Sequence, residues 1–137
     1  MDFVTFEIAK KLKEKGFREP CFGWYRPREV CVYDYQTFID LNQSDCRGDL
    51  YDDLLISHND DKHIDAPTIS QVLKWLREKY SIHISTKPYS CEDGLVWLYE
   101  IRKFNKNIVF IMANKTGFTK EEQASLAGIE YVIDNLI

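Results

Sequence analysis

A chain of 137 residues is long enough for one domain with a buried core and too short for two ordinary domains. Hydrophobic residues at 45% and aromatic residues at 14% exclude a disordered chain, while 29% charged residues and a net charge of −4 suit a solvated surface. No apolar run approaches the ~20 residues that a membrane span needs, and the N-terminus lacks the basic and apolar regions of a signal peptide. The sequence therefore predicts a cytoplasmic protein with no membrane partner.

The first predicted elements are a helix and a β-hairpin. The helix covers residues 5–15, because Thr5 is a suitable N-cap, apolar residues recur at helical spacing after it, and Gly16 can end it. Residues 21–25 and 30–35 are rich in aromatic and β-branched side chains, and a short run with proline separates them. These two runs predict the strands of the hairpin.

The next segment, about residues 36–65, is predicted to be a long acidic loop. Residues 34–65 contain nine aspartates and only two basic side chains, Arg47 and Lys62, which gives this segment a net charge of −7. Connections of this length are uncommon inside compact domains and are usually functional or mobile. The acidic charge of the protein is therefore concentrated in one segment.

The second half of the chain begins with the clearest helix. Thr68 and Gln71 have the spacing of a capping box, and the apolar residues that follow form one stripe on a 3.6-residue period. The period then changes to two, which is typical of a strand that buries one face. The elements predicted in this half are a helix over 69–80, strands over 82–86, 95–101 and 108–112, and a final helix over 119–136 with a second capping box at its start.

The element order α-β-β-loop-α-β-β-β-α places the protein in the α+β class. We expect a single domain over residues 1–137, with a mixed sheet covered by helices on one face. Residues 68–137 form a C-terminal α-β-β-β-α unit within it. The apolar residues on both sides of strand 95–101 predict that this strand is central in the sheet.

No motif in the sequence predicts an enzyme. There is no nucleophile elbow and no glycine-rich phosphate loop, and the four cysteines are scattered, so we expect reduced thiols. His58 and His63 lie among aspartates, but their spacing matches no metal-site template and a solvated acidic loop is the simpler interpretation. His83 alternates with two isoleucines and is expected on the opposite face of its strand. We predict no catalytic residues, no metal and no cofactor.

Two groups of residues are candidates for binding a protein partner. Spaced carboxylates can occupy sites built for phosphates, so the acidic segment could compete with nucleic acid for a basic groove on another protein. The predicted hairpin also places aromatic and guanidinium groups near its tip. The partner-binding candidates are Asp45, Asp49, Asp52 and Asp53 in the acidic segment, and Trp24, Tyr25 and Arg26 as exposed residues of the hairpin.

The alternative is a nucleic-acid-binding module that uses Arg26, Arg28, Lys74 and Arg77. The order α-β-β-β-α of the second half resembles the double-stranded RNA-binding domain. That family holds phosphates with lysines at the start of its last helix, whereas residues 119–123 here contain one lysine and two glutamates. The resemblance is one of shape, and the charge at this position contradicts the activity.

A second resemblance rests on several stretches: residues 66–68 (Ala-Pro-Thr), 74–79 (Lys-Trp-Leu-Arg-Glu-Lys), 82–84 (Ile-His-Ile), 97–101 (Trp-Leu-Tyr-Glu-Ile), 121–124 (Glu-Glu-Gln-Ala) and 127–130 (Ala-Gly-Ile-Glu). With these stretches the chain resembles a group of small uncharacterised proteins encoded by phages and mobile elements of gut anaerobes. The group has no assigned activity, so the resemblance implies a context and no catalytic residues. The first functional hypothesis is therefore a non-catalytic accessory protein that binds a macromolecular partner, with a host defence nuclease as one target to be inhibited.

Overall fold

The computed structural model describes residues 2–25, 30–32 and 64–137, which form two compact units. The first unit lies within residues 3–68, and the second comprises residues 69–137 together with Asp2. Helices and antiparallel sheets alternate in the predicted order, so the α+β class is confirmed. That the chain forms a single domain over residues 1–137 stays a prediction.

The first unit begins with helix α1 (Phe6–Glu14), as expected. The Thr5 hydroxyl accepts a hydrogen bond from the Ile8 N–H at 3.3 Å, which satisfies one of the unpaired amides at the helix start. Gly16 follows the helix with a φ of 88°, and the Phe17 N–H donates back to the Leu12 carbonyl at 3.0 Å. The helix buries Ile8, Ala9 and Leu12, the stripe that the apolar spacing predicts.

A three-stranded antiparallel sheet completes the first unit, in the order β2-β1-β3. Strand β1 (Gly23–Tyr25) pairs with β2 (Val30–Val32), which confirms the predicted hairpin. It also pairs with β3 (Ile64–Ala66), a strand that the sequence did not predict. Three residues of apolar-polar-apolar alternation after a long acidic stretch are too few to distinguish a strand from a loop.

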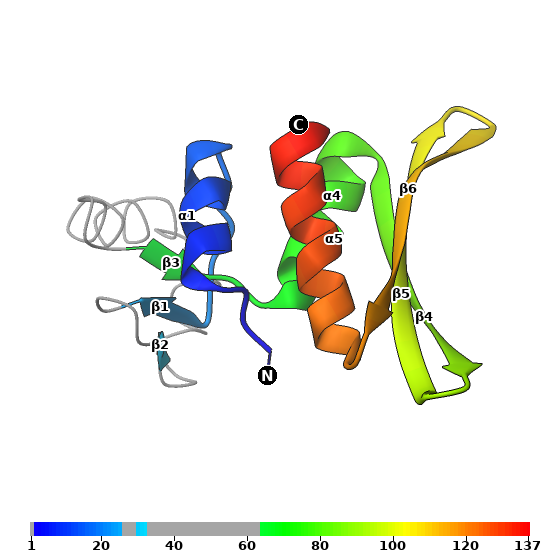
Figure 1. Ribbon diagram of the computed structural model, residues 1–137. Coiled ribbons are helices and arrows are strands. Elements are labelled where there is room, and N and C mark those ends of the chain that lie inside the picture. The colour runs from blue at the N-terminus through cyan, green and yellow to red at the C-terminus, as the bar shows by residue number, and fades with distance from the viewer. Residues whose placement is uncertain (1, 26–29, 33–63) are drawn as a thin grey trace. The chain divides into compact units, whose positions relative to one another are not determined.

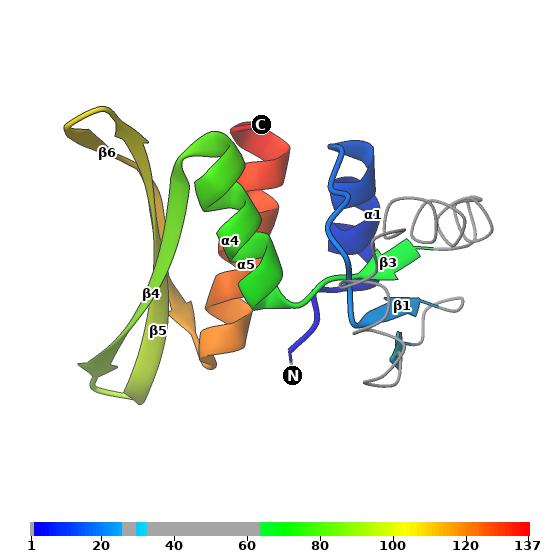
Figure 2. The same ribbon diagram turned by 180° about the vertical axis from the view of Figure 1, so that it is seen from behind.

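The second unit is built on a three-stranded sheet with the order β4-β5-β6. Its strands are β4 (Ile82–Cys91), β5 (Gly94–Asn105) and β6 (Ile108–Phe118), and its helices are α4 (Ile69–Tyr80) and α5 (Glu121–Asn135). Both helices lie on the same face of the sheet (Figures 1 and 2). Strand β5 is central, as predicted, and neither α4 nor α5 lies on the opposite face of the sheet (Figure 1).

The core of the second unit lies between the helices and the sheet. Strand residues Ile82, Ile84, Tyr99 and Ile101 are buried. They alternate with more exposed residues, because successive side chains of a strand point to opposite faces. The helices contribute Val72, Trp75, Leu76, Ala124, Ile129, Val132 and Ile133. The unit is therefore stabilised by burial on one face of its sheet.

Gly128 allows α5 to approach the sheet closely. A Cβ atom at this position would lie 2.9 Å from the Ile84 Cγ2 atom and 3.3 Å from the Tyr99 Cγ atom. Gly128 therefore faces β4 and β5, where a larger residue would require the helix or the strands to shift.

The structure corrects three further details of the prediction. The strands form two antiparallel sheets rather than one mixed sheet, and the short turns of the second unit impose this, since parallel strands need long crossover connections. Strand β4 continues through Pro88, and β6 continues through Gly117, where the register shifts by a bulge. Helix α5 begins at Glu121 with Lys120 as a cap that makes no side-chain hydrogen bond, so the second capping box is wrong.

Candidate functional site

Large apolar side chains are exposed around the turn that joins β5 to β6. We call residues 104–112 the hairpin end. Six of its apolar residues are exposed by 42–63% of their surface: Phe104, Ile108, Val109, Phe110, Ile111 and Met112. In both views this part of β5 and β6 curves away from α4 and α5 (Figures 1 and 2). Contiguous exposed apolar residues of this kind commonly mark an interaction surface.

The hairpin end is apolar on both faces of the strand pair. Phe104 pairs with Val109 across the two strands, and both point to the face opposite α4 and α5. Ile108 and Phe110 belong to the other face, where Phe110 is paired with Lys103. An apolar ligand can therefore contact this strand pair from either side.

His83 is placed beside this surface. Its ring centroid lies 6.2 Å from that of Phe104 in an edge arrangement. His83 is half-buried between the buried Ile82 and Ile84, so the prediction that it points to the opposite face is confirmed. The ring packs against an aromatic neighbour, which is a structural role.

The segment that contains the hairpin end, residues 101–120, is basic. Residues 101–120 contain five basic side chains and no acidic one: Arg102, Lys103, Lys106, Lys115 and Lys120. Lys106 lies in the turn between the two strands with a φ of 54°. This segment has the opposite charge to residues 34–65. An anionic partner is therefore favoured at the hairpin end.

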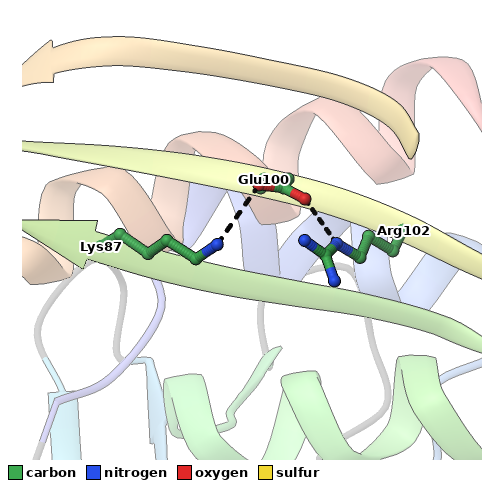
Figure 3. Close-up of polar contacts among 3 residues, drawn as sticks. All are labelled: Lys87, Glu100 and Arg102. Carbon is green, nitrogen blue, oxygen red and sulfur yellow. Dashed lines mark hydrogen bonds and ion pairs between the residues drawn. The ribbon is translucent and has the colours of Figure 1, made fainter.

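Three charged residues form a cluster on the sheet face opposite the helices (Figure 3). Arg102 donates from Nε to the Glu100 carboxylate, and the Lys87 Nζ atom lies 3.6 Å from its other oxygen. The hydrogen bond from Arg102 lowers the pKa of Glu100, and the positive charge of Lys87 acts in the same direction. A carboxylate that two cations hold ionised is a poor proton donor or acceptor, so this cluster orders the sheet surface and is not a catalytic group.

The Cys21 thiol is not suited to act as a nucleophile. The buried Cys21 thiol donates to the Glu19 carbonyl at 3.3 Å. Burial raises its pKa well above the usual value, and the negative charges of Asp65 and Glu19 add to this effect. A thiol with a raised pKa contains little thiolate and reacts slowly. Cys91 is exposed and forms no disulfide.

Several residues singled out from the sequence lie outside the described residues. These are Arg26, Arg28, Asp45, Asp49, Asp52, Asp53, His58 and His63. Their roles stay predictions. Among residues 2–25, 30–32 and 64–137, no group of three His, Cys, Asp or Glu side chains could hold a metal ion, and no helix is long and apolar enough to cross a membrane.

The two described hairpin candidates are not exposed contact residues. Tyr25 is only 5% exposed, so the prediction that it lies on the surface is wrong. Its hydroxyl donates to the Val4 carbonyl, and its ring packs edge-on against Phe6 at 5.5 Å. Trp24 is half-buried. An aromatic hairpin residue next to an amphipathic helix is drawn into the core, because it removes a large apolar area from water.

The candidates on α4 do not form a concentrated basic surface. Lys74 and Arg77 are both exposed, but the Lys74 Nζ atom lies 3.8 Å from the Glu78 carboxylate one turn along the helix. At the start of its last helix, where the double-stranded RNA-binding domain holds phosphates with lysines, the chain carries acid. Helix α5 begins with Glu121 and Glu122.

Sequence reasoning did not identify the hairpin end. Five consecutive apolar residues, 108–112, are typical of a buried strand, and the sequence predicts them as such. The structure places them on the edge strand β6 instead. The lack of any acidic residue in 101–120 was the one feature of the sequence that could have drawn attention to this region.

The chain matches no protein-family model, and no curated protein sequence or solved structure matches it either. Arguments about function therefore start from its own residues.

Proposed function

We propose that this protein is a non-catalytic accessory protein that acts by binding another protein through the hairpin end. The observation that carries the proposal is the exposure of six large apolar residues on one strand pair. Apolar side chains exposed together lower the solubility of a protein and are usually retained where a partner covers them. The resemblance of the sequence to small proteins encoded by phages and mobile elements supports such an element as the source of this protein. A host defence nuclease is then one class of target.

Residues at the two ends of the sheet provide a matched test of this proposal. Ile111, at the hairpin end, is 63% exposed, and Leu95, beside the β4–β5 turn, is 59% exposed. Serine at either position removes similar apolar area from the surface with little effect on the fold. Tagged wild-type protein, Ile111→Ser and Leu95→Ser would be used to capture proteins from a lysate of the cells that produce the chain. We expect a protein that wild type and Leu95→Ser retain and that Ile111→Ser loses.

A captured protein that all three forms retain equally would contradict the proposal. Circular dichroism spectra and thermal unfolding of the three forms are the control, because an unfolded variant would lose any partner. If the Ile111→Ser protein is folded and still binds, the hairpin end is not the contact surface.

Nucleic-acid binding is the second candidate function. Five basic residues with no acidic one in 101–120, next to the exposed rings of Phe104 and Phe110, favour it. A gel shift at low salt with single-stranded and duplex RNA tests it, because phosphate contacts weaken steeply as salt rises. Binding that is strong at low salt, lost at high salt and reduced by Lys106→Glu would support this candidate. No shift at low salt would end it.

A further inference from the structure

The two edges of the β4–β5–β6 sheet differ in how they prevent pairing with another strand. Strand β4 contains Lys87 and Pro88, and proline cannot donate a main-chain hydrogen bond. Strand β6 has neither proline nor charge over residues 108–114, and it pairs regularly with β5 over residues 108–111, before the register shifts between Ile111 and Ala113. No described strand pairs with its outer side. Of the two edges, β6 is therefore the one that can accept an added strand, beside its regular run.

The side chains of β6 fit a strand better than a flat ligand. Ile108 and Phe110 point to one face and Val109 and Ile111 to the other. A strand added beside β6 would place its own side chains on both faces, next to both sets. A nucleic acid lying across one face would leave the other set exposed.

A membrane surface and a second copy of the chain fit less well. The turn that leads the hairpin is Asn105-Lys106-Asn107, so a bilayer would have to take up these polar residues before it reached the apolar ones. Two copies paired through β6 would bring their basic hairpin ends together, and like charges at close range oppose association. Both arguments favour a different protein of opposite charge.

The positions of two lysines indicate where the partner segment should carry acidic residues. Lys106 and Lys115 flank the apolar run of β6. Lys106 lies in the turn before the run, and Lys115 follows it on β6. An extended segment with apolar residues in its middle and carboxylates near both ends would complement β6 in shape, hydrogen bonding and charge.

We propose that β6 binds such a segment, an apolar strand with acidic ends, as a further strand of the β4–β5–β6 sheet. The proposal rests on the proposed function, that the hairpin end binds a protein. It adds the mode of binding, strand addition, and the class of segment that is recognised.

The test uses three labelled synthetic peptides and the full-length protein. The first peptide has a middle of alternating valine and threonine, with two glutamates at each end. The second has lysine in place of every glutamate, and the third keeps the glutamates but carries N-methyl groups on alternate amides of the middle. Fluorescence anisotropy at low salt measures the affinity of each. We expect the acidic peptide to bind at least tenfold more tightly than either of the others.

Charge reversal in the protein sharpens the test. The double variant Lys106→Glu/Lys115→Glu should weaken binding of the acidic peptide at least tenfold and should strengthen binding of the basic peptide. Lys74→Glu is the control, because it reverses an exposed lysine on α4 and should change the affinity less than twofold. Circular dichroism verifies that each variant is folded.

Each other result overturns the proposal in a defined way. Equal binding of the N-methylated peptide excludes strand addition, and no binding of the acidic peptide excludes this class of segment. If Ile111→Ser nevertheless loses a protein captured by wild type, the proposed function stands and only the strand-addition mode fails. A dimer in sedimentation experiments that Ile111→Ser dissociates would assign the β6 edge to a second copy of the chain.

Discussion

Two regions of the same strand pair, β5 and β6, differ strongly in how far their apolar side chains are buried. Ile101, in the region that the helices cover, is fully buried, whereas Ile111, on the neighbouring strand, is 63% exposed. Both are β-branched apolar residues in the same sheet, so residue type does not explain the difference. It arises because Ile101 points to the sheet face that α4 and α5 cover, whereas Ile111, which pairs with Arg102, points to the opposite face. Toward the hairpin end the strands also curve away from the helices (Figure 1). The covered region stabilises the unit, and the exposed region is available for binding.

The largest effect on stability is expected from a substitution in the region that the helices cover. Ile101→Ala should lower the free energy of unfolding by about 2–5 kcal/mol, because it removes buried methyl and methylene groups and leaves a cavity. Urea denaturation followed by circular dichroism measures this loss. A change below about 1 kcal/mol would mean that the helices do not pack on this part of the sheet as described.

The second-largest effect on stability is expected at the contact between α5 and the sheet. Gly128→Ala adds a Cβ atom only 2.9 Å from the Ile84 Cγ2 atom, so the helix or the strand must shift. We expect a loss of about 1–3 kcal/mol in the free energy of unfolding, as for other overpacked cores. A stabilised variant would show instead that α5 can move away from β4 and gain from the higher helix propensity of alanine.

A smaller effect on stability is expected from the charged cluster of Lys87, Glu100 and Arg102, on the sheet face opposite α4 and α5. Arg102 and Lys87 lower the pKa of Glu100 in the folded state, so ionised Glu100 stabilises the fold above its unfolded pKa of about 4.3. This contribution is lost as the pH falls through the lower, folded pKa. The stability difference between wild type and Glu100→Gln should therefore be constant above about pH 6 and should shrink at more acidic pH.

Chemical denaturation of both proteins between pH 3 and pH 7 makes this measurement. The double variant Lys87→Gln/Arg102→Gln is the control, because Glu100 should then titrate near its ordinary pKa. A difference between wild type and Glu100→Gln that grows as the pH falls would contradict the assigned direction of the pKa.

The smallest effect on stability is expected at the hairpin end. Ile111→Ala should change the free energy of unfolding by no more than about 0.5 kcal/mol, since the side chain is already exposed to water. Measured beside Ile101→Ala, it gives the stability contrast between the two regions directly. A loss as large as that of Ile101→Ala would mean that Ile111 is covered in the free protein.

Much of the fold follows from local patterns in the sequence. The cap at Thr5 and the apolar stripes of α1 and α4 predict the helices, since hydrophobic spacing and capping act within a few residues. Strand ends were predicted poorly. Pro88 and Gly117 are usual breaks in a strand, yet an edge position and a bulge accommodate them in β4 and β6.

The candidate site could not be predicted in the same way. Whether residues 108–112 are buried depends on what covers each face of the strand. The run itself does not show that Val109 and Ile111 point away from α4 and α5. The same reason explains Tyr25, whose aromatic ring the neighbouring α1 draws into the core. Charge segregation is visible in the sequence, and the basic segment 101–120 contains the apolar run, but only the structure shows that the run is exposed.

Hydrogen–deuterium exchange of the protein with and without a captured partner tests the central claim most directly. In the free protein, the amides of the outer side of β6 should exchange quickly, because no described strand pairs with them. The account predicts that the partner slows exchange most strongly in residues 104–115. Protection confined to α4 or to residues 21–25, with β6 unchanged, would contradict the claim that the hairpin end is the binding surface.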